Sequence, residues 1–388
     1  MNLIYLDNAA TTWPKPRGTG AAVAEVLSSR GANPGRGSYR MAELSSELVY
    51  RCRCRAAEFF GAKAPERVIF TPSCTHSINY VLKGLLSAGD HVIISDMEHN
   101  AVSRPVMALA KKGVQFSVAH VEEGDAEATV AAFRRAMRVN TKLIFCTHAS
   151  NVFGIKLPIA KIGQLAHRNG ILFGVDCAQS AGTAPLDLAQ LPADFLCMPA
   201  HKGLYGMMGL GLLIVNCDTK LATVIEGGTG SLSGVNVQPE FLPDRLESGT
   251  LNVPAIAALE VGMNFISSVS RERLEAHEMS LICRAYDALS SLPECELYTQ
   301  RPRSETHVPL LSFNIKGIPS DDAAGMLGER DIAVRAGLHC AGEAHRAKGT
   351  QSTGTIRICP SVFTSSDEID AFLAAVREIA EKRTEHPR

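Results

Sequence analysis

Short apolar runs alternate with amphipathic segments between Pro65 and Val215, and this alternation restricts the fold more than any other feature of the chain. Chains that alternate strands with helices form mostly parallel sheets with helices on both faces, and ligands bind at the carboxyl ends of their strands. The fold class is therefore α/β, and residues that directly follow a strand are the candidates for function. We expect strands at residues 68–70, 91–95, 142–147, 171–176, 194–197 and 211–215.

The chain of 388 residues is longer than one compact core usually holds, so we expect two domains. A large domain should span residues 15–250 and a small α+β domain residues 251–388, joined by an N-terminal segment of residues 1–14. The small domain should contain a long helix from residue 254 to about 292, a strand at residues 310–315 and a closing helix at residues 367–382.

Composition excludes several classes of protein. Hydrophobic residues make up 46% and charged residues 20%, and no apolar stretch reaches the roughly eighteen residues that span a bilayer. The net charge of −1 would draw neither nucleic acid nor an anionic membrane. The first residues lack a basic stretch followed by an apolar core, so we expect a cytoplasmic protein. Eleven cysteines at irregular spacing indicate reduced thiols, and without paired CxxC motifs we expect no metal site.

Asp176 and Lys202 each follow an expected strand, 26 residues apart. Most lysines are solvated surface charges, and an aspartate after a strand is often a helix cap, so neither residue alone indicates a site. Together they meet the needs of pyridoxal 5′-phosphate (PLP), which requires a lysine amine for a Schiff base and an acid that keeps its pyridine nitrogen protonated. Their place in neighbouring strand-end loops predicts a PLP site.

The segment at residues 70–76 runs from a strand into a helix whose first turn can offer free N–H groups to a phosphate. Thr75 could add its hydroxyl. Alternatively, Ser73 or Thr75 simply caps the helix, and the segment can both cap the helix and bind phosphate. His99 follows the strand at residues 91–95, where an imidazole could stack on a pyridine ring or transfer a proton; a structural role is the alternative.

Cys340 lies in a glycine-flanked segment beside His339 and Arg335, and this setting favours an accessible, partly ionised thiol suited to nucleophilic attack. An inert buried thiol is the alternative, and it suits Cys146, Cys197 and Cys359 better because these lie inside apolar runs. Arg357, in a strand-like segment, offers a fork for a substrate carboxylate.

Two further segments allow more than one interpretation. Residues 226–236, EGGTGSLSGVN, suit either a loop that reaches a neighbouring subunit or a simple flexible loop. Residues 51–55, RCRCR, lie in a helical pattern that begins near Glu43, and we expect a solvated helix face there, with phosphate docking as the lesser alternative.

The chain resembles the cysteine desulfurase and selenocysteine lyase family, the class V branch of the fold-type I PLP-dependent transferases. The resemblance covers nearly the whole chain and implies a large domain with a mostly parallel sheet and a small α+β C-terminal domain. It rests on YLDNAATT (5–12), MEHN (97–100), SNVFG (150–154), DCAQ (176–179), HK (201–202), ESGT (247–250) and RAGLHC (335–340).

The resemblance also implies the roles of individual residues. Around the cofactor, the residues implied are Lys202 as its covalent anchor, His99 stacked on the ring, Asp176 at the ring nitrogen, Gln179 at the phenolic oxygen, and Thr75, His201 and Thr250 at the phosphate. Cys74 is a further candidate for cofactor binding, where it could reshape the pocket, and simple packing is the alternative. Thr250 would come from a second subunit, so the resemblance implies a homodimer. Asn151 and Arg357 would hold the substrate carboxylate, and Arg36 would approach from the partner.

The reaction implied is the conversion of L-cysteine to L-alanine, with sulfur kept on Cys340 as a persulfide until an acceptor protein or small thiol collects it. L-selenocysteine lysis, β-elimination and epimerisation are alternatives on the same scaffold, and a non-catalytic sulfur carrier is an alternative of another class. Three departures from the family pattern stand out. Pro199 replaces a hydroxyl residue expected at the phosphate, and Cys74 and His76 replace the commoner Thr and Glu.

Overall fold

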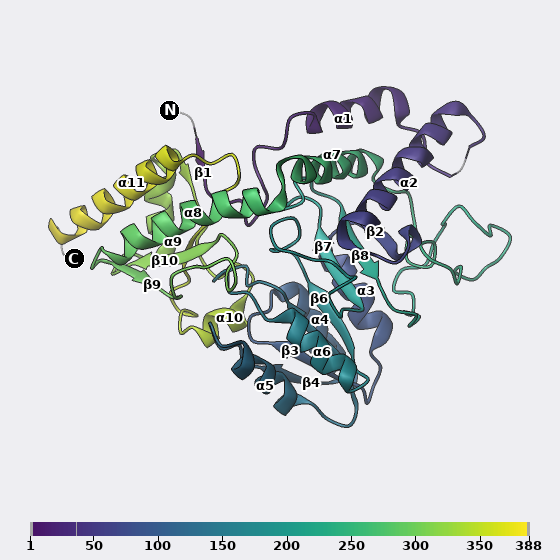
Figure 1. The fold of residues 1–388 in the computed structure, drawn as a ribbon, viewed down its shortest axis with the longest axis horizontal. Helices are drawn as coiled ribbons and strands as arrows, with labels where there is room; N and C mark the ends of the chain where they lie inside the picture. The colour runs from purple at the N-terminus through teal and green to yellow at the C-terminus, as the bar shows by residue number, and fades with distance from the viewer. Residues whose placement is uncertain (1–2, 36, 386–388) are drawn as a thin grey trace.

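A computed structural model describes residues 3–35 and 37–385 of the chain. Its centre is a seven-stranded sheet in which β8 runs antiparallel to both of its neighbours and the other strands are parallel (Figure 1). The strands in spatial order are β2 (Val68–Thr71), β8 (Gly211–Val215), β7 (Phe195–Pro199), β6 (Leu172–Asp176), β5 (Thr141–Thr147), β3 (His91–Ser95) and β4 (Gln115–Ala119).

Helices cover both faces of this sheet, which explains why its inner strands are apolar on both sides. Alternate side chains of one strand enter different hydrophobic clusters: Leu143 and Phe145 pack on one face, and Ile144 and Cys146 on the other. The first face carries α3 (Cys74–Leu85) and α4 (Asn100–Ala110). The opposite face carries α2 (Arg40–Phe60), α5 (Ala126–Ala136), α6 (Ile159–Arg168) and α7 (Val253–Val269). The shorter helical segments before and beside them are α1 (Thr19–Glu25), η1 (Val26–Arg30) and η2 (Pro65–Arg67).

All six expected strands are present, two with the expected ends and four with ends that differ by one or two residues, but the sequence analysis missed β4. This strand lies at the edge of the sheet, and its side chains are mostly half-buried or exposed. An edge strand needs no continuous apolar run, so it lacked the signal that marked the buried strands.

A smaller antiparallel sheet lies beside the large one, in the order β12 (Ile356–Ile358), β10 (Leu311–Ile315) and β9 (Cys295–Leu297). It packs with α8 (Arg271–Ser290), α9 (Ser320–Gly328) and α11 (Ser366–Glu385) around a hydrophobic cluster of its own. The N-terminal strand β1 (Ile4–Tyr5) pairs with β11 (Ile332–Ala333), so the first residues join these C-terminal elements. The domain limits at residues 14, 250 and 388 stay predictions.

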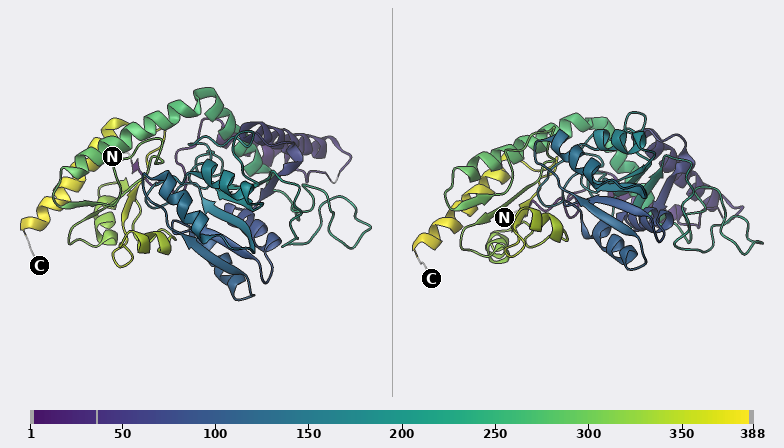
Figure 2. Two further views of the ribbon diagram at one scale, coloured as in Figure 1. Left: turned by 60° about the horizontal axis from the view of Figure 1, so that its bottom comes forward. Right: turned by 90° about the horizontal axis from the view of Figure 1, so that it is seen from below.

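The long helix expected from residue 254 to about 292 is wrong, because the structure has two helices there. Ser270 breaks the helix with a φ of 79° and caps α8 by accepting a hydrogen bond from the amide of Arg273. The axes of α7 and α8 differ by 84°. Figure 2 shows α8 running beside α11, away from the central sheet. Among the described residues no single helix is long and apolar enough to cross a membrane, and only the bent α7–α8 pair passes a length and composition test.

Candidate active site

A cavity of about 260 Å³ lies at the carboxyl ends of the large sheet's strands and reaches the small sheet. Its walls come from segments that are far apart in the sequence, which meet because parallel strands end at one edge of the sheet. The predicted site residues that line it are Cys74, Thr75, His99, Asn151, Asp176, Gln179, His201, Lys202, Cys340 and Arg357.

Asp176 is the last residue of β6 and is almost fully buried. Its Oδ1 accepts hydrogen bonds from the amide of Ala178 (2.9 Å) and from the thiol of Cys74 (3.6 Å). Burial raises the pKa of this carboxyl, and the Ala178 amide, the Lys202 charge and the Cys74 thiol oppose the rise. Three groups therefore help to keep Asp176 ionised in a buried place.

Lys202 follows β7 and faces the same cavity. Burial lowers the pKa of its amine and the nearby Arg357 charge adds to this, whereas Asp176 acts in the opposite direction. A larger fraction of the amine is neutral than in a solvated lysine, and a neutral amine is the form that acts as nucleophile or base. The N-terminal segment fixes the loop that carries it, because the Thr12 hydroxyl donates to the carbonyl of Lys202 (3.0 Å).

Helix α3 begins at the cavity and is capped by Ser73, whose hydroxyl accepts from the amide of His76. Among the described residues, the amides of Cys74 and Thr75 donate to no acceptor, so they remain available to an anion. Gly211 lets β8 approach closely, because a Cβ there would lie 2.7 Å from the Cys74 amide nitrogen. The helix end therefore presents free amides to the cavity, an arrangement suited to an anion.

His99 caps α4, and its Nδ1 accepts a hydrogen bond from the amide of Ala101 (3.0 Å). Burial, together with the charge of Lys202, lowers the pKa of His99 to about 4. Its imidazole is therefore neutral at neutral pH, and its flat face is free to pack on an aromatic ring. Just before it, Glu98 is fully buried and ties the loop to β5 by accepting from the amide of Thr147 (3.0 Å).

Cys340 is exposed and lies on a loop of unusual backbone geometry. His339 and Cys340 have φ values of 47° and 57°, in the left-handed region that non-glycine residues rarely adopt. Three hydrogen bonds hold this conformation: the Cys340 carbonyl accepts from the Asn100 amide (2.7 Å), the His339 carbonyl from Asn151 Nδ2 (2.8 Å), and the Thr355 carbonyl from His339 Nε2 (2.9 Å). The thiol is thus held at the mouth of the cavity.

The segment that follows Cys340 is not an extended loop. It contains α10 (Gly342–Ala347), and Lys348 anchors its end to Glu123 through an ion pair of 2.6 Å. Burial lowers the pKa of His339 to about 3, so its imidazole is neutral and supplies no positive charge to the thiol. The cation that lines the cavity on this loop is Arg335.

Arg357 lies on β12 and is buried. Its guanidinium donates to the carbonyl of Asn151 (2.8 Å) and to the carboxylate of Asp7 (2.8 Å). The sequence analysis named Arg335 and His339 only as neighbours that favour an ionised Cys340, and it did not select Asp7. Asp7 could have been found from its place in the YLDNAATT segment.

The comparisons with known proteins agree on one family. The aminotransferase class-V family matches residues 4–372. The chain belongs to this family. Probable cysteine desulfurases of Methanothermobacter thermautotrophicus and Vibrio cholerae are both 31% identical to it over 97% of the chain and, respectively, 94% and 93% of their own length. A cysteine desulfurase from Thermococcus onnurineus NA1 superimposes with a TM-score of 0.88 at 29% identity, covering 98% of this chain and 95% of that one.

Class-V aminotransferases are PLP enzymes, and the residues of the cavity fit that cofactor. The Lys202 amine and Asp176 Oδ2 have no hydrogen-bond partner in residues 3–35 and 37–385, so both are available to a ligand. The unpaired amides at the start of α3 suit a phosphate group. Lys202 would anchor PLP, Asp176 would meet its ring nitrogen, and α3 with Thr75 and His201 would hold its phosphate.

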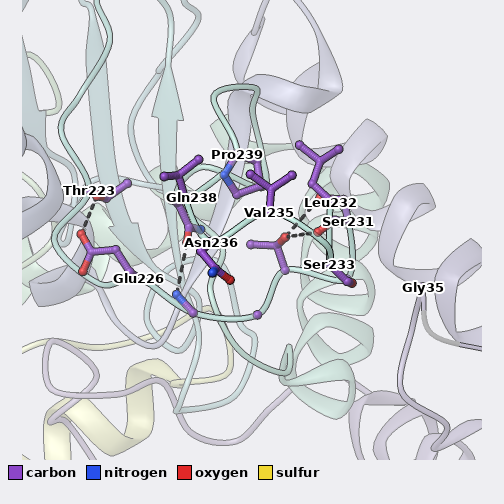
Figure 3. A pocket seen from close by; sticks show the side chains of 15 residues that line it. Gly35, Thr223, Glu226, Ser231, Leu232, Ser233, Val235, Asn236, Gln238 and Pro239 are labelled. Atoms are coloured by element: carbon purple, nitrogen blue, oxygen red, sulfur yellow. Dashed lines mark hydrogen bonds between the residues drawn. The ribbon is translucent and has the colours of Figure 1, made fainter.

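One predicted site residue, Thr250, is exposed and lies outside this cavity, and Arg36 is not among the described residues. A wider cavity of about 950 Å³ is formed by Gly35 and the glycine-rich loop from Thr223 to Pro239 (Figure 3). Glu226 is the only ionisable residue of its lining within the described chain.

Proposed function

We propose that this chain is a PLP-dependent cysteine desulfurase that converts L-cysteine to L-alanine and keeps the sulfur on Cys340. The observation that carries the proposal is the exposed thiol of Cys340 at the cavity that also contains Lys202 and Asp176. An accessible thiol there is placed to attack the sulfur of a substrate that lies over Lys202. The cysteine desulfurase names of the relatives support the same activity.

PLP, when bound, supplies an electron sink that stabilises negative charge at the α-carbon of the substrate. Asp176 would keep a proton at the pyridine nitrogen, because its carboxylate is buried and its Oδ2 is available to that nitrogen. Lys202, with its lowered pKa, takes the α-proton of the substrate as a neutral amine. The neutral His99 would pack against the ring and limit its movement.

Sulfur transfer uses Cys340. Its thiolate forms a bond to the substrate sulfur while the Cβ–S bond breaks, and the electron pair of that bond remains with the substrate carbon. A proton delivered to this carbon, and the return of the α-proton from Lys202 to the α-carbon, complete L-alanine, and Cys340 carries a persulfide. A thiol from a small molecule or an acceptor protein then removes the outer sulfur and restores the Cys340 thiol.

Asn151 and Arg357 hold the substrate carboxylate in this proposal. The Asn151 amide and the Arg357 guanidinium lie at one wall of the cavity and are joined by the hydrogen bond from Arg357 to the Asn151 carbonyl. A guanidinium has five donors and uses two of them in the contacts with Asn151 and Asp7, so others remain for a carboxylate.

The proposed active unit is a homodimer, in which Thr250 reaches the phosphate of the partner's site. Figures 1 and 2 show the loop that leads to Thr250 projecting from the end of the molecule opposite α11. Its apolar side chains Leu232, Val235, Val237 and Phe241 are exposed in the single chain. Such a patch on a projecting loop is suited to burial against a second copy.

The experiment that tests the proposal is a product assay with purified protein, L-cysteine and a thiol reductant. Wild type and a Cys283→Ala control, altered on α8 away from the cavity, should show a visible PLP band and release alanine and sulfide. Cys340→Ala should keep the band and lose both products. A protein without a PLP band, or one whose alanine formation is indifferent to Cys340, would overturn the proposal; selenide release from L-selenocysteine in Cys340→Ala would point to a lyase.

A further inference from the structure

The two oxygens of the Asp176 carboxylate have different surroundings. Oδ1 accepts two hydrogen bonds, from the Ala178 amide at 2.9 Å and from the Cys74 thiol at 3.6 Å. Oδ2 accepts none from the described residues, although the residue is only 2% exposed. A buried carboxylate oxygen without a hydrogen bond is unfavourable, so a ligand that donates to it should bind there. A protonated pyridine nitrogen would be such a donor.

The Cys74 thiol is fixed in place by the helix that carries it. Cys74 is the first residue of α3, directly after the cap Ser73, and its side chain is buried at the cavity wall. Burial and the neighbouring Asp176 charge raise the pKa of Cys74 well above its ordinary value, so its sulfur keeps the proton that it donates.

Other buried thiols near Asp176 do not share this contact. Cys146 and Cys197 are fully buried in neighbouring strands and, among the described residues, donate no hydrogen bond to the carboxylate. Cys177 donates to the carbonyl of Val175 instead (3.7 Å). Among these thiols, the interaction with Asp176 is therefore particular to Cys74.

We propose that Cys74 is a positioning residue that fixes the Asp176 carboxylate, so that Oδ2 meets the pyridine nitrogen of PLP. The proposal rests on the proposed function, because it requires PLP in the cavity. The carboxylate torsion of an aspartate is broad, so one hydrogen bond from Ala178 leaves the group free to swing. The second donor, on a different segment, defines the angle. Cys74 acts through Asp176 and takes no part in proton or sulfur transfer.

The test compares Cys74→Ala, which removes the donor, with Cys74→Ser, which replaces the thiol by a hydroxyl donor. Cys197→Ala is the matched control, because it removes a buried thiol of the same size that makes no bond to Asp176. Each protein is prepared without cofactor and titrated with PLP, and the visible absorption of the loaded protein is followed across pH. Thermal unfolding of the unloaded proteins reports packing separately.

Cys74→Ala should bind PLP about 3- to 10-fold more weakly, the range expected for one weak donor to a charged acceptor. The pH at which the visible absorption of the loaded protein changes should be lower than in wild type, because a less fixed Asp176 holds the ring proton less firmly. Cys74→Ser should lie within about twofold of wild type because a hydroxyl donor is retained, and Cys197→Ala should match wild type in both readouts.

Several results would overturn the proposal. The first is a Cys74→Ala protein with the PLP affinity and pH response of wild type. The second is a loss of PLP affinity in Cys74→Ser equal to that in Cys74→Ala. The third is an equal loss of PLP affinity in Cys197→Ala, which would assign the effect to packing. Wild-type protein that does not take up PLP would instead overturn the proposed function itself.

Discussion

The carboxylate of Asp7 lies 2.8 Å from a guanidinium nitrogen of Arg357, although 350 residues separate the two in the sequence. The Arg357 side chain is 3% exposed and the Asp7 side chain 20%. The N-terminal segment thus orients an arginine of the small sheet. Arg357 also donates to the Asn151 carbonyl in the turn that follows β5, so one side chain connects three parts of the chain at the cavity.

Asp7→Asn should raise the KM for L-cysteine about tenfold with a smaller change in kcat, because a hydrogen bond to a charged group contributes about 1.5–3 kcal/mol. The substitution removes the ionic partner and leaves the long arginine side chain less ordered. Steady-state assays check this, with Asp90→Asn as control, since Asp90 pairs with Lys142 in a partly exposed ion pair remote from the cavity. An unchanged or lower KM would contradict the role given to Asp7.

Arg53 on α2 forms a buried ion pair with Glu247, and both side chains are 7% exposed. Glu247 also accepts from the Phe70 amide (2.6 Å), and the guanidinium lies 4.6 Å from the centre of the Phe70 ring. Arg53→Ala would leave Glu247 buried without a cation, so the free energy of unfolding should fall by about 3–5 kcal/mol. Urea denaturation measures the change.

Arg51→Ala is the matched control on the same helix. Arg51 pairs with Glu260 at 2.6 Å, but its side chain is 56% exposed. Loss of such a surface ion pair should cost about 0–1 kcal/mol. Equal effects of the two substitutions would show that burial does not set the strength of the Arg53 pair.

Glu278 on α8 is almost fully buried and accepts a hydrogen bond from the Tyr205 hydroxyl (3.2 Å). Burial raises its pKa from an ordinary value of 4.5 to about 8. Between these values the folded protein holds a proton that the unfolded chain releases, so stability falls as pH rises from about 4.5 to 8, by up to about 1.4 kcal/mol per pH unit.

In Glu278→Gln the free energy of unfolding should therefore fall less steeply between about pH 5 and 8. Groups such as the buried Glu98 account for the slope that remains. Denaturation curves across this range check the change. The exposed Glu272 on the same helix is the control, and Glu272→Gln should keep the wild-type slope. A slope in Glu278→Gln as steep as that of wild type would contradict the raised pKa.

The buried strands and the residues after them could be predicted because each strand of a parallel sheet covered on both faces is a continuous run of apolar residues. Asp176 and Lys202 illustrate this: each follows a run of apolar residues, and the sheet brings the ends of those runs together. β4 has no continuous apolar run, because an edge strand is only partly buried. The break at Ser270 was hidden because the helical pattern continues on both sides of it.

Contacts between distant segments could not be predicted. The prediction of a solvated face at residues 51–55 is wrong for Arg53 and Cys52, which are buried, because Glu247 supplies a buried partner 194 residues away. The same holds for Cys74, whose acceptor Asp176 is 102 residues away, and for Asp7 beside Arg357. The residue types were visible in the sequence, but the partners that give them a role were set by the fold.

Cys146 and Cys197 are buried as expected, whereas Cys359 is only partly so.

The most direct test of the account is mass spectrometry of the peptide that contains Cys340, after PLP-loaded protein has reacted with L-cysteine in the absence of reductant. The account predicts one added sulfur atom on Cys340, none on Cys283, and none on Cys340 in a Lys202→Ala variant. Alanine formed by wild type with an unmodified Cys340, or sulfur added equally to Cys340 and Cys283, would contradict it.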